Sequence, residues 1–318
     1  MTTRTLLPTA ATILAAFTLT ADVPAQSSTA KLTLERSING LSNWQRVPLT
    51  AEMLNNGDID LSAVSSNAFY RMKIAVSPTP PTPDNMITVQ GGVLPPSSPI
   101  AGNAVATFRI GKYEVTWDEW QEVRAWAITN GYSDLVSVGA GSAGNHPVRH
   151  VSWYEVVKWS NARSEKTGLA PVYQVGGTTY RTGVSVPAVN SNANGYRLPT
   201  LSEWTWAERG GVNSQGYIYS GSNDANAVAW YFDNSSGAVV DMNDGRGTWP
   251  TGTKAANELG IHDMNGNVWE WVFDAIGSVR RIGGGSWISI PDDFRLSDVA
   301  DNPGRRSSVI GFRSARNL

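Results

Sequence analysis

The sequence predicts an α+β fold that is low in regular structure and closed around a tryptophan-rich core. The chain of 318 residues contains 13 Trp, a large number for its length, and buried indole rings supply much apolar area. Its 31 Gly and 17 Pro residues indicate many turns and loops. The helix-start pattern Ser/Thr-x-x-Glu also occurs three times. We therefore expect three short helices among strands and long loops.

The three predicted helices begin after Thr116, Ser152 and Thr200, each of which is followed three residues later by Glu. In such a capping box the hydroxyl accepts a hydrogen bond from a first-turn amide, and the Glu reaches back to the amide of the cap. Apolar side chains at helical spacing, Trp prominent among them, follow each start. Glycines that can end the helices follow in turn at Gly131, Gly168 and Gly210-Gly211.

The region before these helices divides into three parts. Residues 1–25 are typical of an export signal, because the apolar run Ala10–Leu19 is followed by small residues before Gln26. Residues 31–76 contain short strand-like runs separated by turns, which predicts a small all-β module. The Pro-rich stretch 77–85 favours an extended linker, so the main domain is expected over residues 86–316.

Charge and cysteine content exclude several classes of protein. The chain has 25 basic and 27 acidic side chains, and no clustered basic face argues for nucleic acid. No later run is long enough to span a membrane, so we expect an exported protein, periplasmic or extracellular. The sequence has 0 Cys, which removes disulfides and every thiol-based reaction.

A series of short strings runs through the main domain. The strings are Val89–Gly92, Phe108–Thr116, His146–Val148, Val151–Trp153, Tyr196–Thr200, Glu203–Gly211, Asn257–Trp271, Arg281–Trp287 and Ile310–Arg313. In this order they resemble the formylglycine-generating enzymes, or sulfatase-modifying factors. The resemblance extends from about Met86 to the end of the chain and implies a C-type-lectin-like α+β fold.

The resemblance also implies where the family's copper chemistry would lie. Copper-dependent members use two cysteines just after the Gly-Gly-Ser-aromatic string to oxidise a sulfatase Cys to formylglycine. By this resemblance the first position corresponds to Ser289, and the second falls between Pro291 and Phe294. A hydroxyl cannot replace a thiolate as a soft ligand of Cu(I). The sequence thus argues against copper and against the family reaction.

Calcium is the metal that the resemblance favours. A family loop equivalent to Asp263–Glu270 holds a structural Ca²⁺, with Asp263 and Glu270 as carboxylates and Gly266 and Val268 as carbonyl donors. Oxygen ligands at these short spacings suit Ca²⁺. The alternative is an ordinary turn with Glu270 as a satisfied polar residue. A second family site would use Asp244, although an acidic surface turn explains that residue equally well.

Two further groups of residues are candidates for sites. His146 and His150 have the spacing of paired ligands, but Pro147 and the Ser152 cap place them in a loop and no third ligand is near. The segment Ser289–Ser308 carries mixed charge on expected loops, which fits either a binding surface or a solvated, salt-bridged face.

Two classes of function therefore stay open. The first is a formylglycine-generating oxidase acting on sulfatase Cys or Ser motifs. The second, which we favour because both copper-site cysteines are missing, is a non-catalytic module that binds a peptide, protein or glycan. The sequence does not identify the ligand.

Overall fold

A computed structural model describes residues 30–37, 45–47, 54–55, 58–59, 69–76, 85–237, 245–295 and 299–318. The chain divides into two compact units, Met1–Pro83 and Asp84–Leu318. The expected export signal and most of the Pro-rich linker lie outside the described residues. Within the described part, no helix is both long enough and apolar enough to cross a membrane.

The strands described in the first unit form two small antiparallel groups. One is a sheet with the order β2-β1-β5, made of Gln45–Val47, Ala30–Ser37 and Phe69–Val76. In its register Leu34 lies opposite both Val47 and Met72. The other pairs β3 (Leu54–Asn55) with β4 (Asp58–Ile59). These five strands lie between residues 30 and 76, the region in which the β module is predicted.

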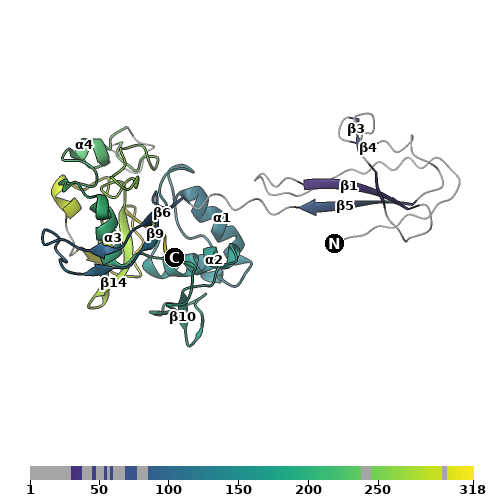
Figure 1. Ribbon diagram of the computed structural model, residues 1–318, viewed down its shortest axis with the longest axis horizontal. Helices are drawn as coiled ribbons and strands as arrows, with labels where there is room; N and C mark the ends of the chain where they lie inside the picture. The colour runs from purple at the N-terminus through teal and green to yellow at the C-terminus, as the bar shows by residue number, and fades with distance from the viewer. Residues whose placement is uncertain are drawn as a thin grey trace. The chain divides into compact units, whose positions relative to one another are not determined.

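The second unit contains two four-stranded sheets joined by its last strands (Figure 1). The first sheet has the order β13-β18-β9-β6, with β13 at Tyr196–Arg197, β18 at Ala315–Arg316, β9 at Phe108–Gly111 and β6 at Met86–Val89. The second has the order β16-β15-β14-β17, with β16 at Ala300–Asp301, β15 at Val279–Gly283, β14 at Trp269–Ile276 and β17 at Ile310–Gly311. The chain passes directly from β17 to β18, so residues 312–314 cross from one sheet to the other.

All three predicted helices are present: α1 (Trp117–Ile128), α2 (Trp153–Lys166) and α3 (Leu201–Glu208). Their N-caps are the predicted hydroxyl residues, and the reciprocal capping box forms at α2 and α3. At α1 the cap accepts from the Glu119 amide, but the Glu119 carboxylate pairs with Arg163 of α2 instead. Positive φ at Gly131, Gly168 and Gly210 follows the three helix ends.

Several short elements were not predicted. A fourth helix, α4 (Ala225–Val228), is capped by the Asp224 side chain and has only four residues, too few for a periodic pattern. Short 3₁₀ turns lie at Ser133–Leu135 (η2), Gly211–Asn213 (η3) and Pro291–Arg295 (η4). The strands β7 (Gly92–Val93) and β8 (Ala104–Val105) form a separate pair.

The core of the second unit is built largely from indole rings, as the composition predicts. Trp120 and Trp159 of α1 and α2 stack with ring centroids 5.4 Å apart, and Phe312 meets both edge-on. The indole N–H groups donate to backbone carbonyls: Trp120 to Val138 at 3.0 Å and Trp159 to Trp120 at 3.1 Å. Burial of these rings therefore leaves no unsatisfied donor among them.

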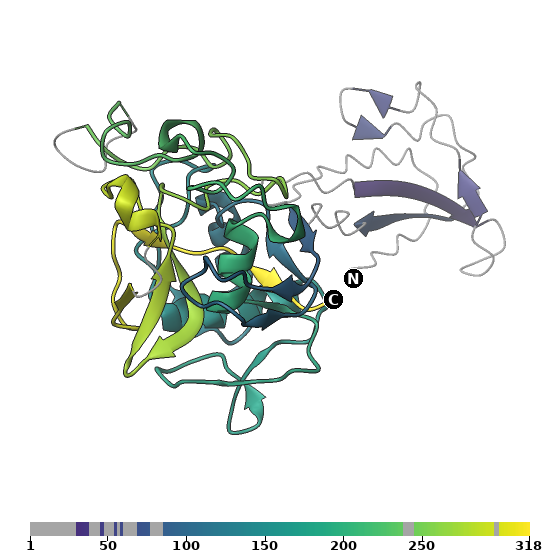
Figure 2. The ribbon, with the colours of Figure 1, turned by 60° about the vertical axis from the view of Figure 1, so that its left-hand side comes forward.

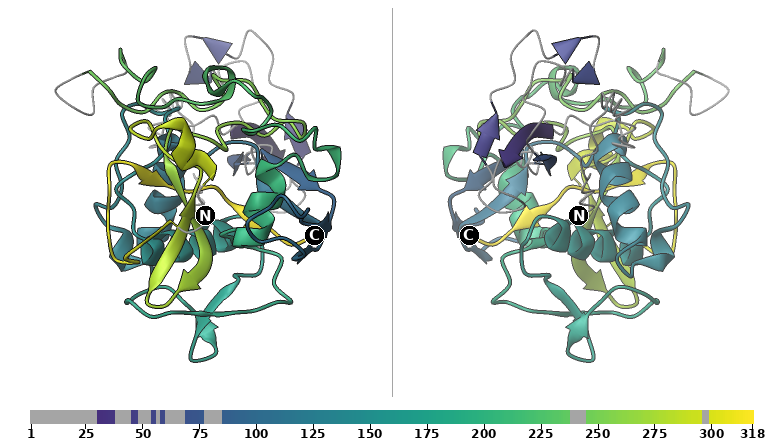
Figure 3. Two further views of the ribbon diagram at one scale, coloured as in Figure 1. Left: turned by 90° about the vertical axis from the view of Figure 1, so that its left-hand side faces the viewer. Right: turned by 90° about the vertical axis from the view of Figure 1, so that its right-hand side faces the viewer.

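Two parts of the second unit project from this core. The β14–β15 hairpin is the long yellow-green pair in Figure 2. A three-stranded sheet of order β11-β10-β12, made of Thr178–Thr179, Tyr173–Val175 and Ala188–Val189, extends away from the helices and the larger sheets (Figure 3). Its connecting segment exposes Val184 and Val186, at 76% and 61%.

Candidate functional site

The centre of the second unit holds a buried ion pair between Glu270 of β14 and Arg313 of the crossover. Their exposed fractions are near zero. The Arg313 Nε donates to Glu270 Oε2 at 2.7 Å, and its Nη2 contacts Oε1 at 2.5 Å. The remaining guanidinium donors reach the carbonyls of Gly111, His262 and Asp263 at 3.0–3.2 Å. Buried charges are tolerated when they are paired and fully hydrogen-bonded in this way.

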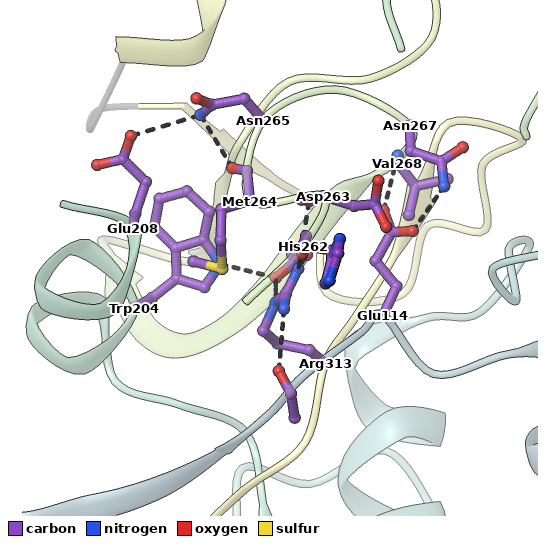
Figure 4. Close-up of polar contacts among 12 residues, drawn as sticks. Glu114, Trp204, Glu208, His262, Asp263, Met264, Asn265, Asn267, Val268 and Arg313 are labelled. Atoms are coloured by element: carbon purple, nitrogen blue, oxygen red, sulfur yellow. Dashed lines mark hydrogen bonds and ion pairs between the residues drawn. The ribbon is translucent and has the colours of Figure 1, made fainter. Parts of the chain in front are cut away.

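Two more carboxylates lie beside this pair (Figure 4). Glu114, between β9 and α1, is 1% exposed and accepts from the Asn267 Nδ2 at 2.7 Å and the Val268 amide at 3.1 Å. Asp263 is 2% exposed, and its Oδ2 accepts from the Gly252 amide at 2.6 Å. Its Oδ1 is buried without a hydrogen-bond partner. We refer to Glu114, Asp263, Glu270 and Arg313 together as the ionic centre.

Burial shapes the protonation of this centre. It is the largest cause that raises the pKa of Glu114 well above its usual range, and the charges of Asp263 and Glu270 add to the effect. Burial likewise raises the pKa of Asp263 to about 6. The Arg313 guanidinium opposes both shifts, but one cation cannot neutralise three carboxylates. A proton or another cation is favoured at this position.

The structure brings the four expected calcium residues together in one loop but gives each an additional role. Glu270 already accepts from Arg313 and from the Trp204 Nε1 at 2.7 Å. The Gly266 amide donates to the Gly284 carbonyl, and the Val268 amide donates to Glu114. No cluster of three or more His, Cys, Asp or Glu side chains suited to a metal occurs in the described ranges. Calcium at these residues stays a prediction, and Asp244 lies outside the described residues.

The histidines do not form a metal centre within the described part of the chain. His146 is buried, and its Nδ1 lies 3.0 Å from the Thr248 Oγ1. Burial lowers the pKa of His146 and of His150, and the neighbouring Arg149 charge lowers both further. These shifts favour the neutral form of both imidazoles, and both residues lie in the loop inferred from Pro147.

Ser289, the position implied for the first copper cysteine, points inward. It is 4% exposed, its Oγ accepts from the Ser286 amide at 3.1 Å, and its own amide donates to the Ser286 carbonyl at 2.9 Å. Phe294 of η4, in the range implied for the second cysteine, is 3% exposed and packs against Gly285 and the aromatic rings of Tyr219 and Tyr231. Residues 286–294, which we call the serine segment, thus place a neutral hydroxyl and an apolar ring at these two buried positions.

The surface around Ser289 is apolar. Phe232, Ile288 and Ile290 are 42%, 44% and 54% exposed, and the Phe232 amide donates to the Ser289 carbonyl at 3.0 Å. We call these three side chains the apolar patch. The guanidinium of Arg246 lies 4.1 Å from the centroid of the Phe232 ring.

The charged residues of Ser289–Ser308 behave differently from the patch. Arg306 pairs with Glu155 of α2, and Arg305 pairs with Asp301 at 3.3 Å. The Asp293 carboxylate accepts from the Ile290 amide at 3.1 Å. These contacts match the salt-bridged alternative for this segment, in which exposed isoleucines lie beside exposed charged side chains such as Arg305 and Arg306.

Sequence reasoning missed the roles of Glu114 and Arg313. Both lie in strings that carry the family resemblance, Tyr113-Glu114-Val115 and Gly311-Phe312-Arg313, but neither string shows which partner the side chain has. A charged residue between apolar neighbours in a predicted strand is the one available signal, because such a residue is buried only when it is paired.

Comparison with known proteins identifies the family to which the second unit is similar. A family model described as "Sulfatase-modifying factor enzyme 1-like domain" matches residues 73–318. The chain is similar to "Chaperone protein LppX" of Paenibacillus barcinonensis, with 35% identity over 67% of this chain and 82% of that protein. It is also similar to "Inactive C-alpha-formylglycine-generating enzyme 2" of Bos taurus, with 25% identity over 61% of this chain and 68% of that protein. The solved structure "Crystal Structure of CarF" superimposes with a TM-score of 0.63 and 30% identity, covering 74% of this chain and 99% of that chain.

Proposed function

The chain belongs to the sulfatase-modifying factor enzyme 1-like family, and we propose that it is an exported, non-catalytic member that binds a polypeptide through the apolar patch. The observation that carries the proposal is the serine segment. Where the family resemblance implies two thiols, Ser289 turns its hydroxyl into the backbone and Phe294 fills the adjoining space. No cysteine elsewhere can substitute, because the sequence has 0 Cys.

The chemistry of the oxidase explains why these replacements argue against the family reaction. Cu(I) needs soft thiolate ligands, and a neutral serine hydroxyl bound to a backbone amide offers neither the charge nor the polarizability. The alternative, a formylglycine-generating oxidase, would require a different ligand set. The relative named an inactive formylglycine-generating enzyme supports the view that the family retains its fold in proteins without the reaction.

The character of the apolar patch favours a polypeptide ligand over a glycan. Two of its three side chains are aliphatic, and sugars stack on flat aromatic faces. Arg246 already occupies a face of the one aromatic ring, Phe232. Exposed apolar side chains with a polar rim are typical of protein interfaces. The relative named a chaperone protein supports the same class of ligand.

A matched pair of double variants tests the patch. We expect Ile288→Ser/Ile290→Ser to lose most of the protein's ability to suppress aggregation of an unfolded model protein, reduced α-lactalbumin, measured by light scattering. The control Val184→Ser/Val186→Ser removes two apolar side chains that are even more exposed, from the segment between β11 and β12, and should behave as the wild type. Equal loss in both variants, or in neither, would contradict binding at the patch.

A further inference from the structure

The rim of the apolar patch is acidic. Asp233 follows Phe232 directly, and its side chain is exposed. Asp292, two residues after Ile290, is exposed as well. The next residue, Asp293, is half-buried, and its carboxylate accepts from the Ile290 amide at 3.1 Å. Each of the two segments that supply the patch therefore carries carboxylates next to its exposed apolar side chains.

One cation belongs to the same surface, but it is held by the patch itself. Arg246 is the one basic residue in the described stretches 217–237, 245–250 and 284–294, which form and flank the patch. Its Nε donates to the Phe232 carbonyl at 3.1 Å, and its guanidinium lies 4.1 Å from the centroid of the Phe232 ring. The three rim carboxylates outnumber this guanidinium, so the rim keeps an excess of negative charge.

The charge acts on the phenol of Tyr231, which precedes Phe232 in the chain. Burial raises the pKa of Tyr231, and the charges of Asp233 and Asp224 raise it further. Negative charge nearby disfavours the anionic phenolate. The side of the patch that Asp233 occupies therefore has a negative potential, which attracts cations and repels anions.

We propose that the polypeptide bound by the apolar patch carries lysine or arginine on either side of its apolar segment. In this arrangement the apolar segment covers Phe232, Ile288 and Ile290, and the flanking cations meet Asp233 and Asp292 at the rim. Complementary charge selects among partners and speeds association, whereas like charges brought together exclude the wrong ones. The inference rests on the proposed function, because it names the class of polypeptide for the same site.

The test measures the binding of three synthetic peptides to the whole chain by fluorescence anisotropy. The peptides share one central run of leucine and valine and carry two lysines, two glutamines or two glutamates at each end. At low salt we expect the lysine peptide to bind about tenfold more tightly than the glutamate peptide, with the glutamine peptide between them. At about 0.5 M NaCl the preference should fall to about threefold or less, because salt screens exposed charges.

Three variants separate the rim from the patch. Asp233→Asn/Asp292→Asn should lower the preference for the lysine peptide to about threefold or less at low salt, since it removes two exposed charges without changing the shape of the rim. The control Asp118→Asn removes an exposed carboxylate of α1 and should keep the full preference. Ile288→Ser/Ile290→Ser should weaken the binding of all three peptides.

The contrary outcomes are distinct for the inference and for the proposed function. Equal binding of the lysine and glutamate peptides, with both weakened in Ile288→Ser/Ile290→Ser, would overturn the inference and leave the proposed function intact. A preference that survives in Asp233→Asn/Asp292→Asn would also overturn the inference, because the selection by charge would then arise elsewhere. Binding that Ile288→Ser/Ile290→Ser leaves unchanged, or no binding of any peptide, would overturn the proposed function and the inference with it.

Discussion

The ionic centre and the serine segment occupy neighbouring parts of the same fold but are built by opposite means. In the ionic centre, charged side chains with exposed fractions near zero are held by ion pairs and backbone hydrogen bonds. In the serine segment, residues 286–294, the buried side chains are hydroxyls and aromatic rings, and the exposed ones are Ile288, Ile290 and Asp292. The centre joins β14 to the crossover between the two sheets, so the fold depends on it. The serine segment follows β15 and is joined to the rest of the fold by hydrogen bonds of its backbone, such as that from the Phe232 amide to the Ser289 carbonyl.

Within this family domain, the residues that hold the fold together are therefore different from those at the position of the family's chemistry. The residues that join the sheets are charged despite the cost of burying them. The position implied for the thiol holds the neutral, buried Ser289. Stability should therefore be sensitive to the ionic centre and tolerant of change in the serine segment.

The largest effect is expected from Arg313→Met. Removing the guanidinium leaves Glu270 buried without its partner and deprives three carbonyls of donors. Breaking one side of a buried ion pair typically costs about 3–5 kcal/mol in the free energy of unfolding. Urea unfolding followed by circular dichroism measures it. The double variant Arg313→Met/Glu270→Gln should recover part of the loss, and a cost below about 1 kcal/mol for the single variant would contradict the role of the centre.

A smaller loss, about 3 kcal/mol, is expected from Phe294→Ala in η4. The ring is 3% exposed and belongs to a small cluster with Tyr231, Ala225 and Ala229, so the cost lies at the low end for a buried aromatic residue. The same urea experiment applies. A loss as large as that of Arg313→Met would show that the serine segment carries as much of the fold as the ionic centre.

The third prediction concerns Glu208, a carboxylate near the ionic centre that has no basic partner at hydrogen-bond distance in the described contacts. Burial raises its pKa from 4.5 to about 7. The folded state therefore keeps a proton that the unfolded chain releases, so stability falls as pH rises from about 4.5 to 7 and is constant above. Between pH 5 and pH 8 the free energy of unfolding of the wild type should fall by about 1–2 kcal/mol relative to that of Glu208→Gln. If the stabilities of the wild type and Glu208→Gln change in parallel with pH, the prediction is refuted.

The smallest effect is expected from Ser289→Ala. The change removes the acceptor of the Ser286 amide and leaves that buried donor unpaired, at a cost of about 1 kcal/mol. Ser289→Cys, which retains a weak acceptor, should cost no more. Chemical unfolding of both variants tests this, and a loss above about 3 kcal/mol would mean that Ser289 is an essential part of the fold.

The local part of the fold was predictable from the sequence. The caps at Thr116, Ser152 and Thr200 and the glycines after each helix act within one turn, so their patterns contain the whole signal. The prediction of a reciprocal contact at Glu119 was wrong, because the Glu119 carboxylate pairs with Arg163 of another helix instead. A local sequence pattern does not indicate tertiary contacts of this kind.

The site was predictable only in part, for the same physical reason. The loss of the thiol at Ser289 follows from the sequence alone, since no cysteine is present. The partnership of Glu270 with Arg313 joins residues 43 positions apart, and that of Glu114 with Asn267 joins residues 153 apart. Neither spacing belongs to a helix or a hairpin, so only the three-dimensional fold identifies these partners.

The central claim, a family scaffold without the family reaction, is tested most directly by mass spectrometry. The purified protein is incubated with Cu(I), oxygen, a reductant and a synthetic peptide that carries a sulfatase Cys motif, beside a family member that has both cysteines as positive control. We expect the peptide Cys to stay unchanged with this protein while the control converts it to the aldehyde. Any copper-dependent aldehyde formed by this protein would show that it retains the family reaction.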